Sequence, residues 1–118
     1  MELRWDAVNI DCADPERLAA FYCELLGVPV RGRWQQYVGL QAKAPGQPRL
    51  VFQGTDDPRP VKNSLHLDLQ VASRQELTAA VERAEALGAR RLERKEEAGE
   101  TWQTMADPEG NVFCLVAD

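Results

Sequence analysis

The feature that most constrains the fold is an internal repeat. Residues 5–27, "WDAVNIDCADPERLAAFYCELLG", and residues 64–88, "SLHLDLQVASRQELTAAVERAEALG", follow one plan. In each, an alternating segment leads into a polar cap, then into a helix pattern with apolar residues at i, i+3, i+4 and i+7, and finally into Leu-Gly. Few residues are identical, so the repeat is one of pattern. We therefore expect two similar modules.

Capping residues predict where the two helices begin and end. Asp14 is a good N-cap acceptor, and Pro15 follows at the first helical position, where its missing N–H is not needed. In the second copy an S-x-x-E capping box begins at Ser73. Gly27 and Gly88 supply the left-handed residue that ends each helix.

Short strands are predicted after each helix and are separated by turn-rich pieces. They span 29–33, 34–41, 49–53, 90–93, 101–106 and 111–116. The charged run 93–100 predicts a solvated hairpin loop. The chain of 118 residues is thus expected to form one domain: module one at 1–53, a connector at 54–63 and module two at 64–118, each βαβββ.

Charge and composition exclude several classes of function. The net charge is −5 and no basic run could follow a phosphate backbone, which argues against a nucleic-acid partner. No apolar run approaches the ~20 residues that cross a bilayer, so we expect no membrane partner and a cytoplasmic protein. The three cysteines form no C-x-x-C pair, which favours reduced thiols.

Three ordered motifs lie on this duplicated frame: "ADPERLAAFYCELLG" (13–27), "NSLHLDL" (63–69) and "MADPEGNVFCLV" (105–116). Together they resemble the vicinal oxygen chelate superfamily of glyoxalase I, bleomycin-resistance proteins and extradiol dioxygenases, and above all its glyoxalase-like domains. The resemblance implies an α+β fold in which the two modules form a curled mixed sheet around a cup-shaped cavity, with the helices outside. It also implies a homodimer.

Alternation along the first strand of each module predicts which residues face that cavity. In module two, Leu65, Leu67, Leu69 and Val71 would face the helix, and His66, Asp68 and Gln70 the cavity. The repeat pairs Ala7 with His66 and Asn9 with Asp68. On the last strand, Val112, Cys114 and Val116 would face the cavity.

The resemblance also implies positions for a metal. Metal-dependent members carry a ligand on the first and last strand of each module, which here gives Ala7, His66, Cys114 and either Val51 or Gln53. Alanine has no donor atom, so we expect no catalytic metal and no other cofactor; if a metal bound, His66 would be its first ligand. This disfavours glyoxalase I and dioxygenase activity.

Two main functions follow from these residues, and a weaker third possibility is a degenerate domain kept for protein partnering. The first is a small-molecule binding protein that takes an apolar or aromatic ligand; its expected contacts are His66, Asn9, Trp34, Tyr37, Gln53, Trp102, Met105 and Cys114. The alternative is a lyase or isomerase in which His66, aided by Asp68, acts as a base or metal ligand. In both, Cys114 is more typical of packing than of a nucleophile.

Overall fold

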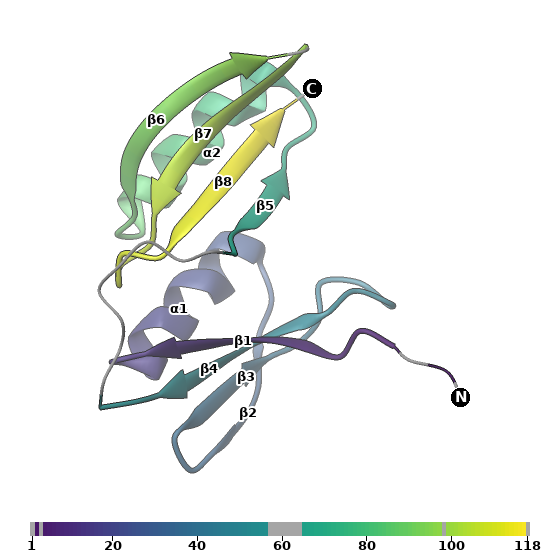
Figure 1. Ribbon diagram of the computed structural model, residues 1–118, viewed down its shortest axis with the longest axis vertical. Helices are drawn as coiled ribbons and strands as arrows, with labels where there is room; N and C mark the ends of the chain where they lie inside the picture. Colours follow the sequence, from purple (N-terminus) through teal and green to yellow (C-terminus); the bar gives the residue numbers. More distant parts are fainter. Residues whose placement is uncertain (1, 3, 57–64, 98, 118) are drawn as a thin grey trace. The chain divides into compact units, whose positions relative to one another are not determined.

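The chain folds into two compact units, Met1–Arg59 and Pro60–Asp118, and each holds one βαβββ module (Figure 1). The computed structural model describes residue 2 and residues 4–56, 65–97 and 99–117. Most of the connector predicted at 54–63 lies outside these described residues. No helix in the described part of the chain combines the length and apolar character that spanning a membrane requires.

Module one is a four-stranded mixed sheet with one helix. Its elements are β1 (Ala7–Cys12), α1 (Pro15–Leu26), β2 (Val30–Trp34), β3 (Tyr37–Leu40) and β4 (Arg49–Gly54). The strand order is β1-β4-β3-β2, in which β1 is parallel to β4 and the other neighbours are antiparallel. Because β1 and β4 are parallel neighbours, the chain must cross over between them, and α1 lies in that connection.

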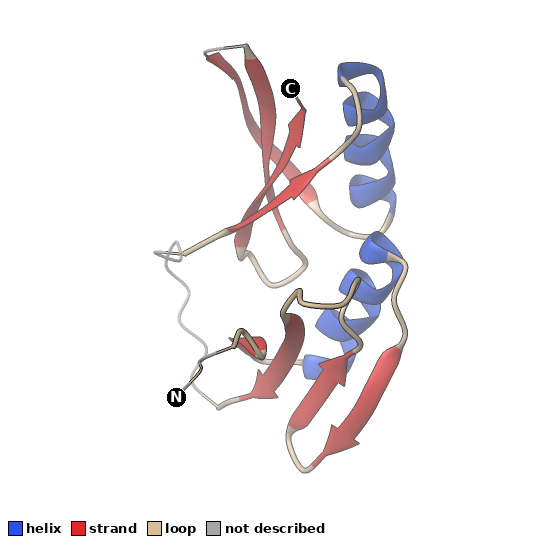
Figure 2. Cartoon of the chain, turned by 90° about the vertical axis from the view of Figure 1, so that its right-hand side faces the viewer, coloured by secondary structure: helices blue, strands red, loops and turns tan. Residues whose placement is uncertain are grey.

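Module two repeats this topology. Its elements are β5 (Leu67–Gln70), α2 (Arg74–Ala86), β6 (Arg90–Glu97), β7 (Glu100–Ala106) and β8 (Val112–Ala117). The strand order β5-β8-β7-β6 again has a parallel first pair and antiparallel hairpins. Figure 2 shows α2 along one face of this sheet, where it contacts β6, β7 and β8. The predicted duplication of an α+β module is confirmed.

The predicted helix starts and the predicted end of α1 are confirmed, whereas α2 is capped by the right-handed Leu87 and Gly88 follows it at φ +114°. The Asp14 side chain accepts a hydrogen bond from the Arg17 N–H at 3.1 Å, and Gly27 ends α1 with φ +68°. At α2, Ser73 accepts from the Glu76 N–H at 3.2 Å. The Glu76 carboxylate reaches back to the Ala72 N–H rather than to that of Ser73, a shifted form of the capping box.

Each module builds its core between its helix and one face of its sheet. In module one the ring of Tyr22 stacks on that of Phe52 with centroids 5.5 Å apart. In module two Leu77 and Phe113 are completely buried. Leu65, expected to face the helix, is instead 84% exposed, because it lies two residues before β5 begins.

Residues 93–97 and 100 of the charged run are strand and not loop, which corrects the prediction. β6 continues to Glu97 and β7 begins at Glu100, where the two residues pair. β6 is an edge strand, and charged side chains on an edge remain in water while they discourage further strand pairing. Charge density alone therefore did not distinguish a solvated strand from a loop.

Candidate functional site

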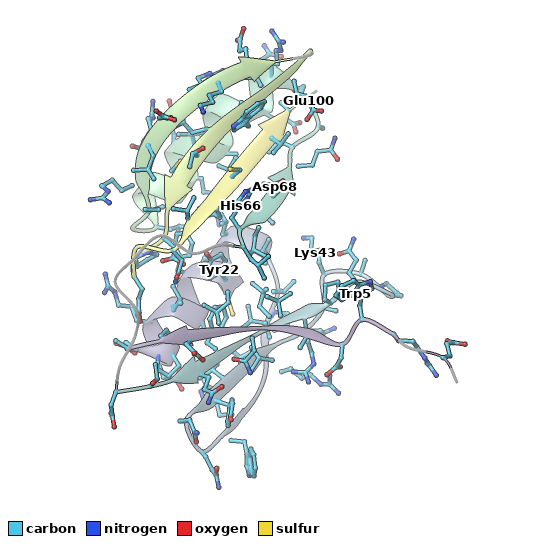
Figure 3. All side chains as sticks on the ribbon, viewed as in Figure 1. Trp5, Tyr22, Lys43, His66, Asp68 and Glu100 are labelled. Atoms are coloured by element: carbon cyan, nitrogen blue, oxygen red, sulfur yellow. The ribbon has the colours of Figure 1, made fainter. Side chains whose placement is uncertain are left out.

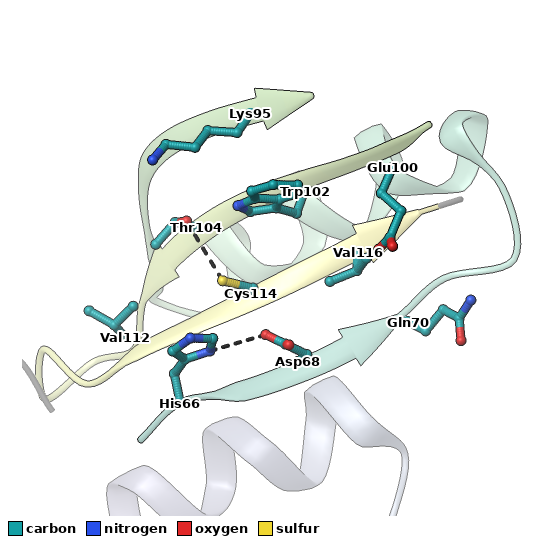
Figure 4. A pocket seen from close by; sticks show the side chains of 10 residues that line it. All are labelled: His66, Asp68, Gln70, Lys95, Glu100, Trp102, Thr104, Val112, Cys114 and Val116. Atoms are coloured by element: carbon teal, nitrogen blue, oxygen red, sulfur yellow. Dashed lines mark hydrogen bonds and ion pairs between the residues drawn. The ribbon is translucent and has the colours of Figure 1, made fainter. Parts of the chain in front are cut away.

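The open face of the module-two sheet carries a hollow of about 670 Å³. Its lining comes from four strands and the residue before β5, always from side chains that point away from α2 (Figure 4). The lining residues are His66, Asp68, Gln70, Lys95, Glu100, Trp102, Thr104, Val112, Cys114 and Val116. On β5, β7 and β8 every lining residue has an even number, because successive side chains of a strand alternate between the two faces of the sheet.

Strand register brings the central side chains into rows across the sheet. Asp68 pairs with Cys114, and Cys114 pairs with Thr104, so one row crosses β5, β8 and β7. In the next row Trp102 lies beside Val116. The parallel pairing of β5 with β8 thus joins residues that are far apart in the sequence.

His66 and Asp68 form the main polar pair of the hollow. His66 Nδ1 lies 3.1 Å from Asp68 Oδ1, and the two side chains are 43% and 60% exposed (Figure 4). A carboxylate that accepts from Nδ1–H fixes the orientation of the imidazole and leaves Nε2 to meet a ligand. The pair can therefore accept a hydrogen bond or a proton from a molecule in the hollow.

Cys114 lies beneath the polar pair. It is only 7% exposed, and its Sγ lies 3.7 Å from Thr104 Oγ1. The donors of His66, Asp68 and Cys114 are all within 4.8 Å of one another, so this cluster could hold a metal ion. Such an ion would compete for the His66 atom or the carboxylate that now form the ion pair.

The four-ligand metal site implied by the fold family does not fit this chain. Asn9 pairs with Val51 in module one as Asp68 pairs with Cys114 in module two, so the structure resolves the open choice between Val51 and Gln53 in favour of Val51. Neither Val51 nor Ala7 has a side-chain donor atom. Two of the four positions are thereby lost, and both lost positions lie in module one.

The other predicted contacts have different positions. Met105 is completely buried among core residues, which corrects its placement in the cavity: it lies three residues from Trp102, and an odd separation along a strand reverses the face. Trp34 and Tyr37 stack on each other at the β2–β3 hairpin with centroids 6.1 Å apart. These two residues, with Asn9 and Gln53, belong to module one and do not line the module-two hollow.

Sequence reasoning missed three lining residues, namely Lys95, Glu100 and Thr104. Alternation along the predicted strand 101–106 would have found Thr104, because it shares the parity of Trp102. Lys95 and Glu100 could not be assigned, because their segment was expected to be a loop. Burial and nearby Glu24 raise the pKa of the Cys23 thiol, on α1, which leaves that thiol mostly protonated at neutral pH.

The sequence model of the glyoxalase-like domain family matches residues 7–116. The chain belongs to this family. A search of curated proteins found no significant match. The match covers both modules, which places the hollow on a glyoxalase-like fold.

Solved structures share this fold across nearly the whole chain. An enzyme of the glyoxalase/bleomycin resistance protein/dioxygenase family from Burkholderia phytofirmans is 21% identical, with a TM-score of 0.86 and 98% of each chain covered. A glyoxalase-related enzyme from Fulvimarina pelagi is 20% identical, with a TM-score of 0.81, covering 99% of this chain and 89% of that one. A lactoylglutathione lyase from Agrobacterium tumefaciens is 17% identical, with a TM-score of 0.72 and coverage of 98% and 94%. At these identities the likeness concerns the fold alone.

Proposed function

We propose that this glyoxalase-like protein binds an apolar or aromatic small molecule on the open face of module two, without a catalytic metal. The observation that carries the proposal is the hollow, in which Trp102, Val112 and Val116 form an apolar floor beside the His66–Asp68 pair. Ligand sites typically combine such an apolar lining with a few polar groups in a volume of roughly 300–1,000 Å³.

The division of the lining suggests how a ligand would lie. The flat face of Trp102 and the adjacent Val116 would contact an aromatic ring. His66 Nε2 would accept a hydrogen bond from a hydroxyl or amide group of the ligand, while Asp68 holds the imidazole. The loss of donors at Ala7 and Val51 supports binding that does not depend on a metal.

Tryptophan fluorescence tests the proposal in the full chain. A Trp5→Phe/Trp34→Phe variant leaves Trp102 as the only emitter, and it is titrated with a panel of planar aromatic compounds. We expect a saturable change in emission that weakens on His66→Ala. The matched control is Arg74→Met in the same background, because Arg74 is exposed on α2 and does not line the hollow, and it should leave the emission change intact. No change in Trp102 emission with any compound of the panel would contradict the proposal.

Metal content tests the second part. Protein purified without chelators should contain zinc, nickel and iron far below one atom per chain. Stoichiometric metal that is lost in His66→Ala would overturn the metal-free proposal and assign the His66, Asp68 and Cys114 cluster as its site. Cys12→Ser is the control, because that thiol is fully buried in module one.

The His66–Asp68 geometry also favours a second function, a lyase or isomerase. With Nδ1 held by Asp68, Nε2 can take a proton from a carbon acid and return it at a neighbouring atom. Deuterium incorporation from D₂O into a compound that binds, followed by NMR, would detect this step. His66→Gln should abolish the exchange and Asp68→Asn should slow it; binding with no exchange leaves the first function standing alone.

The sheets themselves favour self-association, and we propose that the protein is a homodimer. The strand orders leave β1 and β2 at the edges of one sheet and β5 at one edge of the other, whereas the charged side chains of β6 discourage pairing at the opposite edge. Open edges are commonly covered by another chain. Light scattering coupled to size exclusion should give twice the 13.2 kDa chain mass, and a monomer at high concentration would contradict this.

A further inference from the structure

Module one carries a second hollow, of about 520 Å³, whose character differs from that of module two. It lies between the segment before β1, the start of β2, the loop between β3 and β4, and the first residue of β4. Figure 3 shows Trp5 at this end of module one, which also carries the loop with Lys43. Three of its lining residues are arginines, Arg4, Arg31 and Arg49.

Arg49 is the central group of this hollow. It is the register partner of Ala7, the position at which the family resemblance implies a metal ligand. The side chain is 26% exposed. Its guanidinium lies over Gly39, where an added Cβ would be 3.1 Å from Nη1. The missing side chain at Gly39 is what gives the guanidinium room against the sheet.

The donors of Arg49 are incompletely used. Its Nε is buried and has no hydrogen-bond partner among the described residues. Its Nη2 lies 3.6 Å from Asp6 Oδ2, beyond good hydrogen-bonding distance, and Asp6 is 82% exposed. A buried donor without a partner is unfavourable, and a guanidinium presents Nε–H and Nη–H as a fork that matches two oxygens of an anion.

The charge of the hollow is opposite to that of the whole chain. The chain has a net charge of −5, yet the lining contains three arginines against a single carboxylate, Asp6. Arg4 also pairs with Glu2 at 3.3 Å, but both side chains are highly exposed, and such a pair is weak. A local positive potential in an acidic protein favours anions over cations.

From these observations we infer that module one contains a binding site for a small oxyanion, a carboxylate or a phosphate group, centred on Arg49. The anion takes the place of the distant Asp6 carboxylate and accepts from the guanidinium, with Arg31 contributing charge at the rim. Trp5 lies in the same lining and offers a ring face to whatever the anion is attached to. This inference is independent of the module-two ligand, because every lining residue belongs to module one.

The test uses the full chain with Trp34→Phe and Trp102→Phe, which leaves Trp5 as the only emitter. It is titrated separately with inorganic phosphate and with benzoate, with NaCl adjusted to keep the ionic strength constant, and binding is checked by calorimetry. We expect saturable binding of at least one anion. Benzoate alone would assign the carboxylate form of the site, and phosphate alone the phosphate form.

Variants then locate the site. Arg49→Met should weaken binding by roughly tenfold or more, the value of a charge-assisted hydrogen bond. Gly39→Ala keeps the Arg49 residue but crowds its guanidinium, so it should also weaken binding. Arg49→Lys should weaken it because lysine keeps the charge and loses the fork. Arg74→Met is the matched control, because Arg74 is exposed at the start of α2, and it should bind normally. No saturable binding of either anion by calorimetry, or unchanged affinity in both folded Arg49 variants, would overturn the inference.

Discussion

Replacement of Asp107 should destabilise module two by loosening the turn that positions β8. Asp107 is 4% exposed, and its Oδ1 accepts hydrogen bonds from the Glu109 and Asn111 N–H groups, each at 2.9 Å. Hydrogen bonds to a charged acceptor contribute about 1.5–3 kcal/mol each, and two that share one oxygen contribute less than their sum. We therefore expect Asp107→Ala to lower the free energy of unfolding by about 2–4 kcal/mol. Asp107→Asn keeps a neutral acceptor and should cost about half as much.

Urea unfolding followed through Trp102 measures this effect in module two, in a Trp5→Phe/Trp34→Phe background. With a slope of about 2 kcal/mol per molar urea, the middle of the usual range, the midpoint for Asp107→Ala should fall by roughly 1–2 M. The control is Asp11→Ala, an exposed aspartate on β1, which should change stability by less than about 0.5 kcal/mol. If Asp107→Ala behaves like this control, the carboxylate does not hold the turn and the reasoning fails.

Three further predictions concern other parts of the chain. Gln103 is buried, and its Nε2 lies 3.1 Å from each of three backbone carbonyl oxygens near the β6 bulge. Gln103→Leu should lower the free energy of unfolding in urea by about 2–3 kcal/mol, and an unchanged free energy would show that the bulge needs no donor. Burial, and secondly Glu24, raise the pKa of the Cys23 thiol, so the contribution of the protonated thiol to folding stability is present below the ordinary thiol pKa and is lost as pH rises through the raised pKa. Mapped iodoacetamide labelling should show Cys23 reacting more slowly than free cysteine at pH 8, and equal rates would contradict the shift. The ion pair of Arg33 with Glu16, at 2.7 Å, is exposed on both sides; Arg33→Gln should leave the melting temperature unchanged, and a clear fall would assign the pair a structural role.

Local signals were enough for the helices and for the duplicated plan. A cap such as Asp14 or a glycine such as Gly27 acts within one helical turn, so its effect can be read from a few adjacent letters. Alternation is equally local, and it correctly placed His66 and Cys114 on one face of the module-two sheet. Met105 was misplaced because that same rule was not applied to it.

What alternation cannot give is the neighbour across a strand pair. The choice between Val51 and Gln53 depended on the register of β1 against β4, which is fixed by hydrogen bonds between segments about forty residues apart. The assignment of the charged segment β6 as a strand likewise required knowledge of its place at the sheet edge, because the same charged residues are also typical of a loop.

Short-range geometry was therefore enough to predict two βαβββ modules, the helix starts and the faces of most residues on β5, β7 and β8. The folded sheets were needed to show that Asp68 lies beside Cys114, that Trp102 lies beside Val116, and that Arg49 is the register partner of the alanine at the lost metal position. The physical reason is that cross-strand register is set by the packing and hydrogen bonding of the whole sheet. The functional site is a property of that register.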